Sequence, residues 1–89
     1  MELIVKGQFL RDLSSYTNKV LLTEVYTAVK RMETAKDLTA IKNLKKLNDY
    51  KFLYRVKVSE SYRIGLKIQN NKIWLVRFGH RANFYKDFP

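Results

Sequence analysis

The sequence contains no cysteine among its 89 residues, which excludes disulfide bonds and zinc–thiolate sites. This absence fits the reducing cytoplasm, where we expect the protein to act. A single histidine cannot hold a catalytic metal alone, so we expect neither a metal nor another cofactor. Long apolar runs are missing too: none approaches the roughly 20 residues of a membrane-spanning helix, and MELIVKGQF does not resemble a signal peptide. We therefore expect no membrane partner.

Acidic residues are scarce: 8 Asp and Glu stand against 18 Lys and Arg, a net charge of +10. The imbalance is concentrated in the second half. Residues 1–44 hold seven basic and five acidic residues, and residues 45–89 hold eleven and three, so the second half carries +8 of the +10. Such a half is typical of proteins that bind a polyanion, which can be nucleic acid, an anionic membrane or an acidic protein. The alternative is a solvated basic surface that serves solubility.

Residues 1–89 are expected to form one domain, because the chain is short and its 46% of hydrophobic residues suffices for a compact core. ELIVK is a short β-branched run that predicts a strand, which Gly7 ends. FLRDLSSY predicts a helix whose apolar face comprises Phe9, Leu10, Leu13 and Tyr16. After a break at SSYTN, Thr17 or Asn18 can cap a second helix over KVLLTEVYTAVKRMETA. The two helices should pack as an antiparallel hairpin.

The second half changes from helical spacing to alternation. FLYRVKV, YRIGLKI and IWLVRFG predict three antiparallel strands, separated by SES and QNN. Asn70–Asn71 suits a tight hairpin turn, because asparagine tolerates a left-handed backbone. The connector KDLTAIKNLKKLNDYK is expected to hold a helical turn. The predicted fold is therefore α+β: an N-terminal strand that can join the sheet, an antiparallel helix hairpin, and a three-stranded antiparallel meander packed on the helices.

Alternation along the first two strands of the meander separates apolar from basic side chains. The basic side chains, predicted to form an open face, are those of Arg55, Lys57, Arg63 and Lys67. Gly65 would leave a gap in the middle of this face, where another backbone can approach closely. The alternative is an ordinary solvated face of an antiparallel sheet.

The third strand of the meander is apolar on both faces. Alternation places Arg77 with Ile73 and Leu75, and Phe78 on the opposite face. We therefore expect a strand that is central in the sheet or covered on both faces, and that ends at Arg77 and Phe78 before Gly79 turns the chain.

The side chains available for chemistry are arginine, lysine, histidine and tyrosine, since the chain offers no carboxylate pair, no Ser or Cys triad and no Gly-rich nucleotide loop. This set suits RNA cleavage by the substrate's own 2′-hydroxyl. Arginines can stabilise charge on the phosphate, a tyrosine or lysine can act as base, and His80 as acid. Tyrosines can also stack on unpaired bases. Each residue of RFGHRANFY also has a plainer explanation: a structural His80, a surface cation at Arg81, and packing of the C-terminal tail by Phe84 and Tyr85.

The order strand, two helices, three strands, with LYRVKV, SYRIGLKI, IWLVRFGHR and the tyrosine that follows, resembles the RelE/ParE toxin superfamily of bacterial toxin–antitoxin systems. The resemblance covers nearly the whole chain and is closest to the RelE branch. RelE-like toxins are metal-independent endoribonucleases that cut mRNA in the ribosomal A site. The resemblance thus implies a type II toxin that cleaves ribosome-associated mRNA and inhibits translation. The alternatives are a ParE-like toxin that inhibits DNA gyrase, or a catalytically decayed module that binds RNA or antitoxin.

The resemblance also implies roles by motif position. The implied catalytic residues are Lys57, Arg63, His80, Arg81 and Tyr85. Arg55 matches one member of the family's basic pair on the first strand of the meander, and we expect Arg55, Lys67 and Lys46 to bind RNA. The implied partners are mRNA on the ribosome and a cognate antitoxin, whose acidic or amphipathic segment would cover the basic face. The sequence departs from the family in the turn before YRI, which usually carries glycine and here reads SES.

Overall fold

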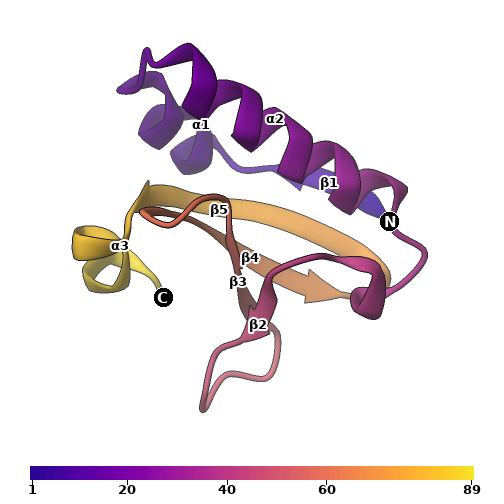
Figure 1. Cartoon of the computed structure of the whole chain (residues 1–89). Helices are drawn as coiled ribbons and strands as arrows, with labels where there is room; N and C mark the ends of the chain where they lie inside the picture. Colours follow the sequence, from indigo (N-terminus) through magenta and orange to yellow (C-terminus); the bar gives the residue numbers. More distant parts are fainter.

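The computed structural model describes residues 1–89. Its elements are, in chain order, β1 (Glu2–Val5), α1 (Gly7–Ser14), α2 (Lys19–Thr34), the 3-10 turn η1 (Leu38–Ala40), β2 (Leu44–Lys46), β3 (Leu53–Lys57), β4 (Tyr62–Gln69), β5 (Lys72–His80) and α3 (Arg81–Asp87). The strands form one sheet in the order β1-β5-β4-β3-β2. β1 runs parallel to β5, and the other neighbours are antiparallel. α1 and α2 lie along one side of the sheet, and α3 follows the end of β5 (Figure 1).

The α+β class, the two successive helices and the β3–β4–β5 meander agree with the sequence prediction, and the opening strand joins the sheet as β1. Two elements were not predicted. The connector holds the expected helical turn, but it then forms β2, which pairs with β3 and makes the sheet five-stranded and mixed. The second is α3, which follows β5.

One hydrophobic core lies between the sheet and the helices α1 and α2. Its most enclosed side chains come from α2, β4 and β5: Met32, Ile64, Leu66, Ile73 and Leu75. Full burial of an aliphatic side chain of this size contributes about 1.5–3 kcal/mol, so these strands hold the sheet against the helices. No helix in the structure combines the length and the apolar character that a membrane crossing requires.

The boundaries of the helices follow from local chemistry. The Asn18 side chain accepts a hydrogen bond from the Leu21 amide at 3.0 Å, which confirms Asn18 as the cap of α2. In α1, Phe9 is buried, but Leu10 is 55% exposed, so its predicted burial is wrong. Leu10 lies about 100° around the helix from Phe9, far enough to face solvent.

A β-bulge explains an error in the predicted faces of β5. Gly65 pairs with Arg77 and Leu66 pairs with Leu75, so Val76 is an extra residue without a partner. A bulge of this kind shifts the alternation by one residue. Arg77 therefore lies on the face opposite to Leu75, contrary to the sequence prediction. The predicted central position of the strand is confirmed, since β5 lies between β1 and β4.

The predicted gap at Gly65 is wrong, because Phe88 fills it. A Cβ atom added to Gly65 would lie 2.8 Å from Cδ1 of Phe88, which is only 2% exposed. α3 brings the ring to this place, and Phe84 packs against it with ring centroids 5.3 Å apart. The centre of the predicted basic face is therefore covered by the C-terminal segment rather than open.

Candidate nucleic-acid interface

Strand register brings four of the predicted catalytic residues to one end of the sheet. Lys57 at the end of β3 pairs with Arg63 at the start of β4. Arg63 also pairs with Gly79 of β5, and His80 and Arg81 follow Gly79 directly in the chain. The amide of Arg81 donates to the Ser61 carbonyl at 2.7 Å, which fixes the start of α3 beside the β3–β4 connection.

A carboxylate that the sequence analysis did not single out lies between these cations. Oε2 of Glu60 is 3.2 Å from Nζ of Lys57, and its Oε1 is 3.5 Å from Nη1 of Arg81. The hydrogen bond and charge of Lys57 lower the pKa of Glu60, and the charges of Arg81 and Arg63 lower it further. We call Lys57, Glu60, Arg63, His80 and Arg81 the turn cluster.

Arg63 is the least accessible cation of the turn cluster, with only 9% of its surface exposed. Its Nη1 donates to the carbonyls of Ser59 at 3.0 Å, Glu60 at 3.1 Å and Tyr62 at 3.1 Å. These charge-assisted bonds hold the β3–β4 connection in shape. The prediction of an open basic face fails at Arg63, because its guanidinium turns into this connection instead of standing free above the sheet.

His80 has a defined structural role. β5 continues through Gly79 to His80, which pairs with Tyr62, so the predicted turn at Gly79 is wrong. His80 is the N-cap of α3, and its Nδ1 accepts a hydrogen bond from the Ala82 amide at 3.0 Å. In the neutral ring that geometry leaves the proton on Nε2. The ring also packs edge-on against Tyr62 at 5.2 Å between centroids.

The remaining predicted residues lie apart from the turn cluster. A shallow depression of about 240 Å³ between β2, the β2–β3 loop and α3 is lined by Lys45, Lys46, Leu47, Asn48, Arg55 and Tyr85. Tyr85 is 51% exposed, so its ring is available to a ligand. The ammonium of Lys46 donates to the Tyr50 carbonyl, whereas Lys45 pairs directly with Arg55 across the strands. Lys45 is thus a basic residue of the depression that the sequence analysis missed.

Lys67 occupies a third position. It pairs with Leu53 on β3 and Trp74 on β5, and its ammonium lies 4.9 Å from the centroid of the Trp74 ring. Along β4 it is separated from Arg63 by Gly65, on which the Phe88 ring rests. The structure therefore divides the predicted site into the turn cluster, the depression at Arg55 and Tyr85, and Lys67.

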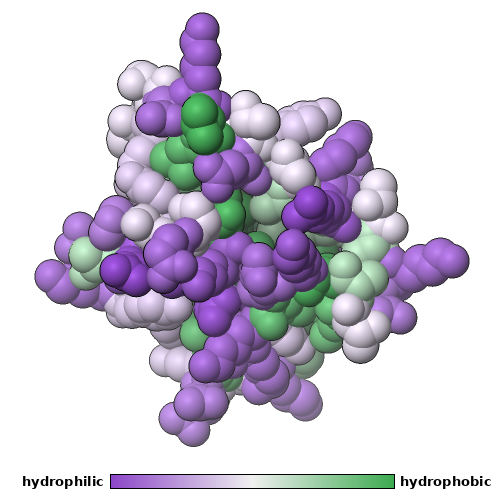
Figure 2. All heavy atoms as spheres, in the orientation of Figure 1, coloured by the Kyte–Doolittle hydropathy of each residue, from purple (hydrophilic) through white to green (hydrophobic).

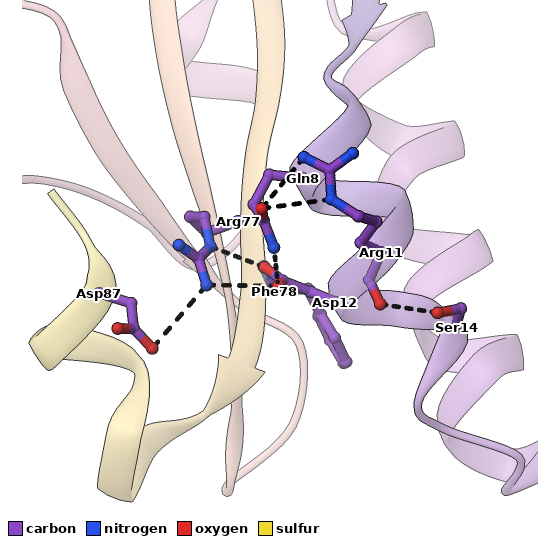
Figure 3. Close-up of polar contacts among 7 residues, drawn as sticks. All are labelled: Gln8, Arg11, Asp12, Ser14, Arg77, Phe78 and Asp87. Atoms are coloured by element: carbon purple, nitrogen blue, oxygen red, sulfur yellow. Dashed lines mark hydrogen bonds and ion pairs between the residues drawn. The ribbon is translucent and has the colours of Figure 1, made fainter.

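Arg77 takes part in a different ion pair, between β5 and α1 (Figure 3). Its Nε lies 2.8 Å from Oδ2 of Asp12, and the same oxygen accepts the Phe78 amide at 3.0 Å. Burial works to raise the pKa of Asp12, but hydrogen bonds from Arg77, the Phe78 amide and Gln8 outweigh it and lower the pKa below its ordinary value. Asp87 of α3 approaches Arg77 from the other side at 3.8 Å. This junction ties α1 to β5 beyond the end of β1.

The face of the molecule seen in Figure 1 is mainly polar. Figure 2 shows the face of the molecule seen in Figure 1, where hydrophilic side chains cover most of the surface and hydrophobic ones form small patches between them.

Two residues of the candidate site, Glu60 and Lys45, were not predicted. Glu60 had one signal in the sequence, the SES turn that departs from the pattern of the RelE/ParE toxins, and Lys45 had none beyond its charge.

Comparisons with known proteins identify the fold through structure rather than sequence. No protein-family model and no curated protein matches the chain. A chain of the RelB–RelE antitoxin–toxin complex from Methanococcus jannaschii is 22% identical, with a TM-score of 0.79 over 97% of this chain and 99% of that one. The Escherichia coli DinJ–YafQ complex matches at 17% identity and a TM-score of 0.66, over 94% and 97% of the two chains. The RelBE2 toxin–antitoxin complex of Mycobacterium tuberculosis matches at 17% and 0.67, over 90% and 96%.

These matches span nearly the full length of each chain, so the whole architecture is shared rather than a single motif. The protein has the fold of RelE-like toxins, which confirms at the level of the fold the resemblance inferred from the sequence.

Proposed function

We propose that the protein is a single-domain toxin of a type II toxin–antitoxin system, acting in the cytoplasm as an endoribonuclease on ribosome-associated mRNA. The observation that carries this proposal is the gathering of Lys57, Arg63, His80 and Arg81 at one end of a RelE-like sheet. The three cations Lys57, Arg63 and Arg81 come from β3, β4 and α3 and converge there, as stabilisation of a phosphate in the transition state requires. The 2′-hydroxyl of the RNA would supply the nucleophile.

The accessibility of each cation suggests its role. The side chains of Arg81 and Lys57 are 54% and 37% exposed and can reach a scissile phosphate. Arg63 shapes the β3–β4 connection and adds positive charge behind it. His80 keeps α3 in place through Nδ1 and can donate a hydrogen bond from Nε2 to a phosphate oxygen. To act as the acid that protonates the leaving oxygen, the ring would have to carry a proton on both nitrogens and release the Ala82 amide.

The depression would bind an adjoining stretch of the same RNA. Arg55, Lys45 and Lys46 supply charge for the backbone phosphates, and Tyr85 supplies an exposed ring for stacking on a base. Lys67 would extend the basic surface along β4. The distance between the depression and the turn cluster is spanned by β3, which carries Arg55 and Lys57 two residues apart.

The proposal includes a cognate antitoxin as partner. The matched RelB–RelE and DinJ–YafQ structures are complexes of a toxin with an antitoxin. The net charge of +10 favours an acidic segment in the partner. Co-expression of a cognate antitoxin should restore growth that the toxin alone arrests, and a small acidic reading frame beside this gene is the first candidate to test.

Induced expression with mapping of mRNA 5′ ends tests the proposed reaction. Wild-type protein should arrest growth and create new 5′ ends within translated mRNA. Arg81→Ala should reduce cleavage of ribosome-bound mRNA by about 100-fold, the scale of losing one transition-state donor. Lys72→Ala is the control, because it removes one positive charge from the exposed start of β5, at the opposite end of that strand from His80, and should leave cleavage unchanged.

Two results would contradict the proposal. One is soluble wild-type protein that produces no new 5′ ends on translating ribosomes. The other is inhibition of gyrase supercoiling with mRNA intact, which would assign the protein to the ParE type of action instead.

A further inference from the structure

The β3–β4 connection places a negative charge at the point where the proposed reaction needs a phosphate. Glu60 stands between Lys57 of β3 and Arg81 of α3, with a different carboxylate oxygen directed at each. A phosphate held by the same two cations would need to present two oxygens in a similar way. The carboxylate and the RNA therefore compete for one position.

We propose that Glu60 occupies the anion position of the turn cluster in the free protein, and that an RNA phosphate must displace it to bind. This inference rests on the proposed function, because it concerns the site where that function places the scissile phosphate. Glu60 would lower the affinity of the free protein for RNA, so that only RNA held by additional contacts binds strongly. It would also keep Lys57 and Arg81 close together while no RNA is bound.

The exposure of the three side chains makes displacement easy. Glu60 is 76% exposed, against 37% for Lys57 and 54% for Arg81. Exposed ion pairs of this kind are weak, because water and salt screen them and two long side chains lose freedom. By contrast, the three carbonyl contacts of Arg63 keep the backbone of the connection in place when the Glu60 side chain leaves.

The same geometry argues against Glu60 as the general base of the reaction. A general base works best when its pKa lies near the working pH. Lys57, Arg81 and Arg63 stabilise the charged carboxylate and so lower the pKa of Glu60, which makes it a weaker base. Their effect is to hold it as an anion, which suits a group that takes the place of a phosphate.

The test is a binding measurement on the free protein with a short, non-cleavable 2′-O-methyl oligoribonucleotide. Glu60→Gln keeps the shape of the side chain and removes its charge. It should bind the probe about three- to tenfold more tightly at low salt, and the gain should shrink as salt screens the pairs. Combined with Arg81→Gln, the Glu60→Gln gain should fall, since the two residues are then no longer coupled.

Glu33→Gln is the matched control. Glu33 forms an exposed ion pair with Lys30 on α2 at 3.0 Å, and its substitution removes the same charge far from the turn cluster. An equal gain in both variants would overturn the inference, because it would reflect net charge alone. Unchanged or weaker binding by Glu60→Gln would overturn it too. If cleavage were lost while binding stayed unchanged, Glu60 would instead be assigned as the general base.

The outcomes separate this inference from the proposed function. A wild-type protein that cleaves mRNA, with no gain for Glu60→Gln, would overturn the inference and leave the function standing. A protein that does not cleave, but whose Glu60→Gln variant binds the probe more tightly, would overturn the function and support the assignment of Glu60.

Discussion

Two carboxylates in this molecule hold cations from other elements of the fold, and they do so in opposite surroundings. At the Asp12–Arg77 junction the side chains are 11% and 27% exposed, and Asp12 also accepts a backbone amide. In the turn cluster Glu60 is 76% exposed and contacts only side chains. The first carboxylate is fully engaged within the fold, while the second can be exchanged for another anion. Burial, not the identity of the ion pair, separates a structural contact from a candidate binding site.

The largest expected effect comes from the buried side of this comparison. Asp12→Ala should reduce the free energy of unfolding by about 2–4 kcal/mol, because it leaves Arg77 and the Phe78 amide without their acceptor in a half-buried place. Urea unfolding measures the loss. Glu33→Ala, which breaks an exposed pair, should cost no more than about 0.5 kcal/mol. Equal losses in the two variants would show that burial does not separate the two kinds of ion pair.

The next effect concerns the C-terminal segment, whose Phe88 ring covers Gly65 on β4. Gly65→Ala should destabilise the fold by about 1–3 kcal/mol, because the new methyl group would meet the Phe88 ring at 2.8 Å. Displacement of Phe88 should loosen the end of α3, which faster hydrogen exchange at Phe84 and Phe88 would report. Gly7→Ala is a suitable comparison, since its nearest contact is the flexible end of Arg11 at 3.3 Å. Unchanged stability of Gly65→Ala would mean that Phe88 does not hold this face.

Low pH should weaken the Asp12–Arg77 junction and so reduce the stability of the fold. The pKa of Asp12 is lower in the folded than in the unfolded chain, so its contribution to stability is complete above about pH 5, well above the ordinary aspartate value of about 3.9. It is lost as the pH falls from about 5 through the lowered pKa. Urea midpoints measured across this range should therefore fall less for Asp12→Asn than for the wild type. Parallel pH profiles for the two proteins would show that the fold does not stabilise the charged carboxylate of Asp12.

The smallest effect is expected on the exposed side. Glu60→Gln should leave the melting temperature unchanged within error, because its ion pairs are open to water and the Arg63 contacts to the turn involve backbone carbonyls that remain. Thermal unfolding followed by circular dichroism checks this. A clear fall in the melting temperature would place Glu60 among the structural groups and weaken the contrast with Asp12.

Long elements with strong local signals were predictable from the sequence. α2 combines apolar residues at helical spacing with an Asn18 cap, and both are found as expected. The Asn70–Asn71 turn is also confirmed, with φ values of 53° and 62° at the two residues. In each case the signal lies within a few neighbouring residues, so no knowledge of the tertiary structure was needed.

The missed elements depend on partners that the sequence does not reveal. β2 has three residues, two of them lysines, and exists because β3 offers an edge to pair with. α3 has seven residues and is capped by His80, which is not among the usual capping residues. The bulge at Val76 becomes visible only once β4 and β5 are paired.

The candidate site was predictable in part for the same reason. Alternation correctly placed Arg55 and Lys57 on the face of Arg63, since the register pairs Lys57 with Arg63 and Arg55 with Gly65. It could not foresee that Phe88 would cover Gly65 or that Glu60 would turn back onto Lys57 and Arg81. Those contacts depend on how a turn and a short helix meet in space.

The parallel pairing of β1 with β5 has a consequence for the order of folding. Leu3 pairs with Ile73, and Asp12 meets Arg77 across 65 residues of chain. Contacts this remote in sequence form late and slow the folding of a small domain. β1 therefore has no partner in the sheet until β5 has been made, and the two helices that cover the sheet are synthesised before the strand that joins β1 to the rest.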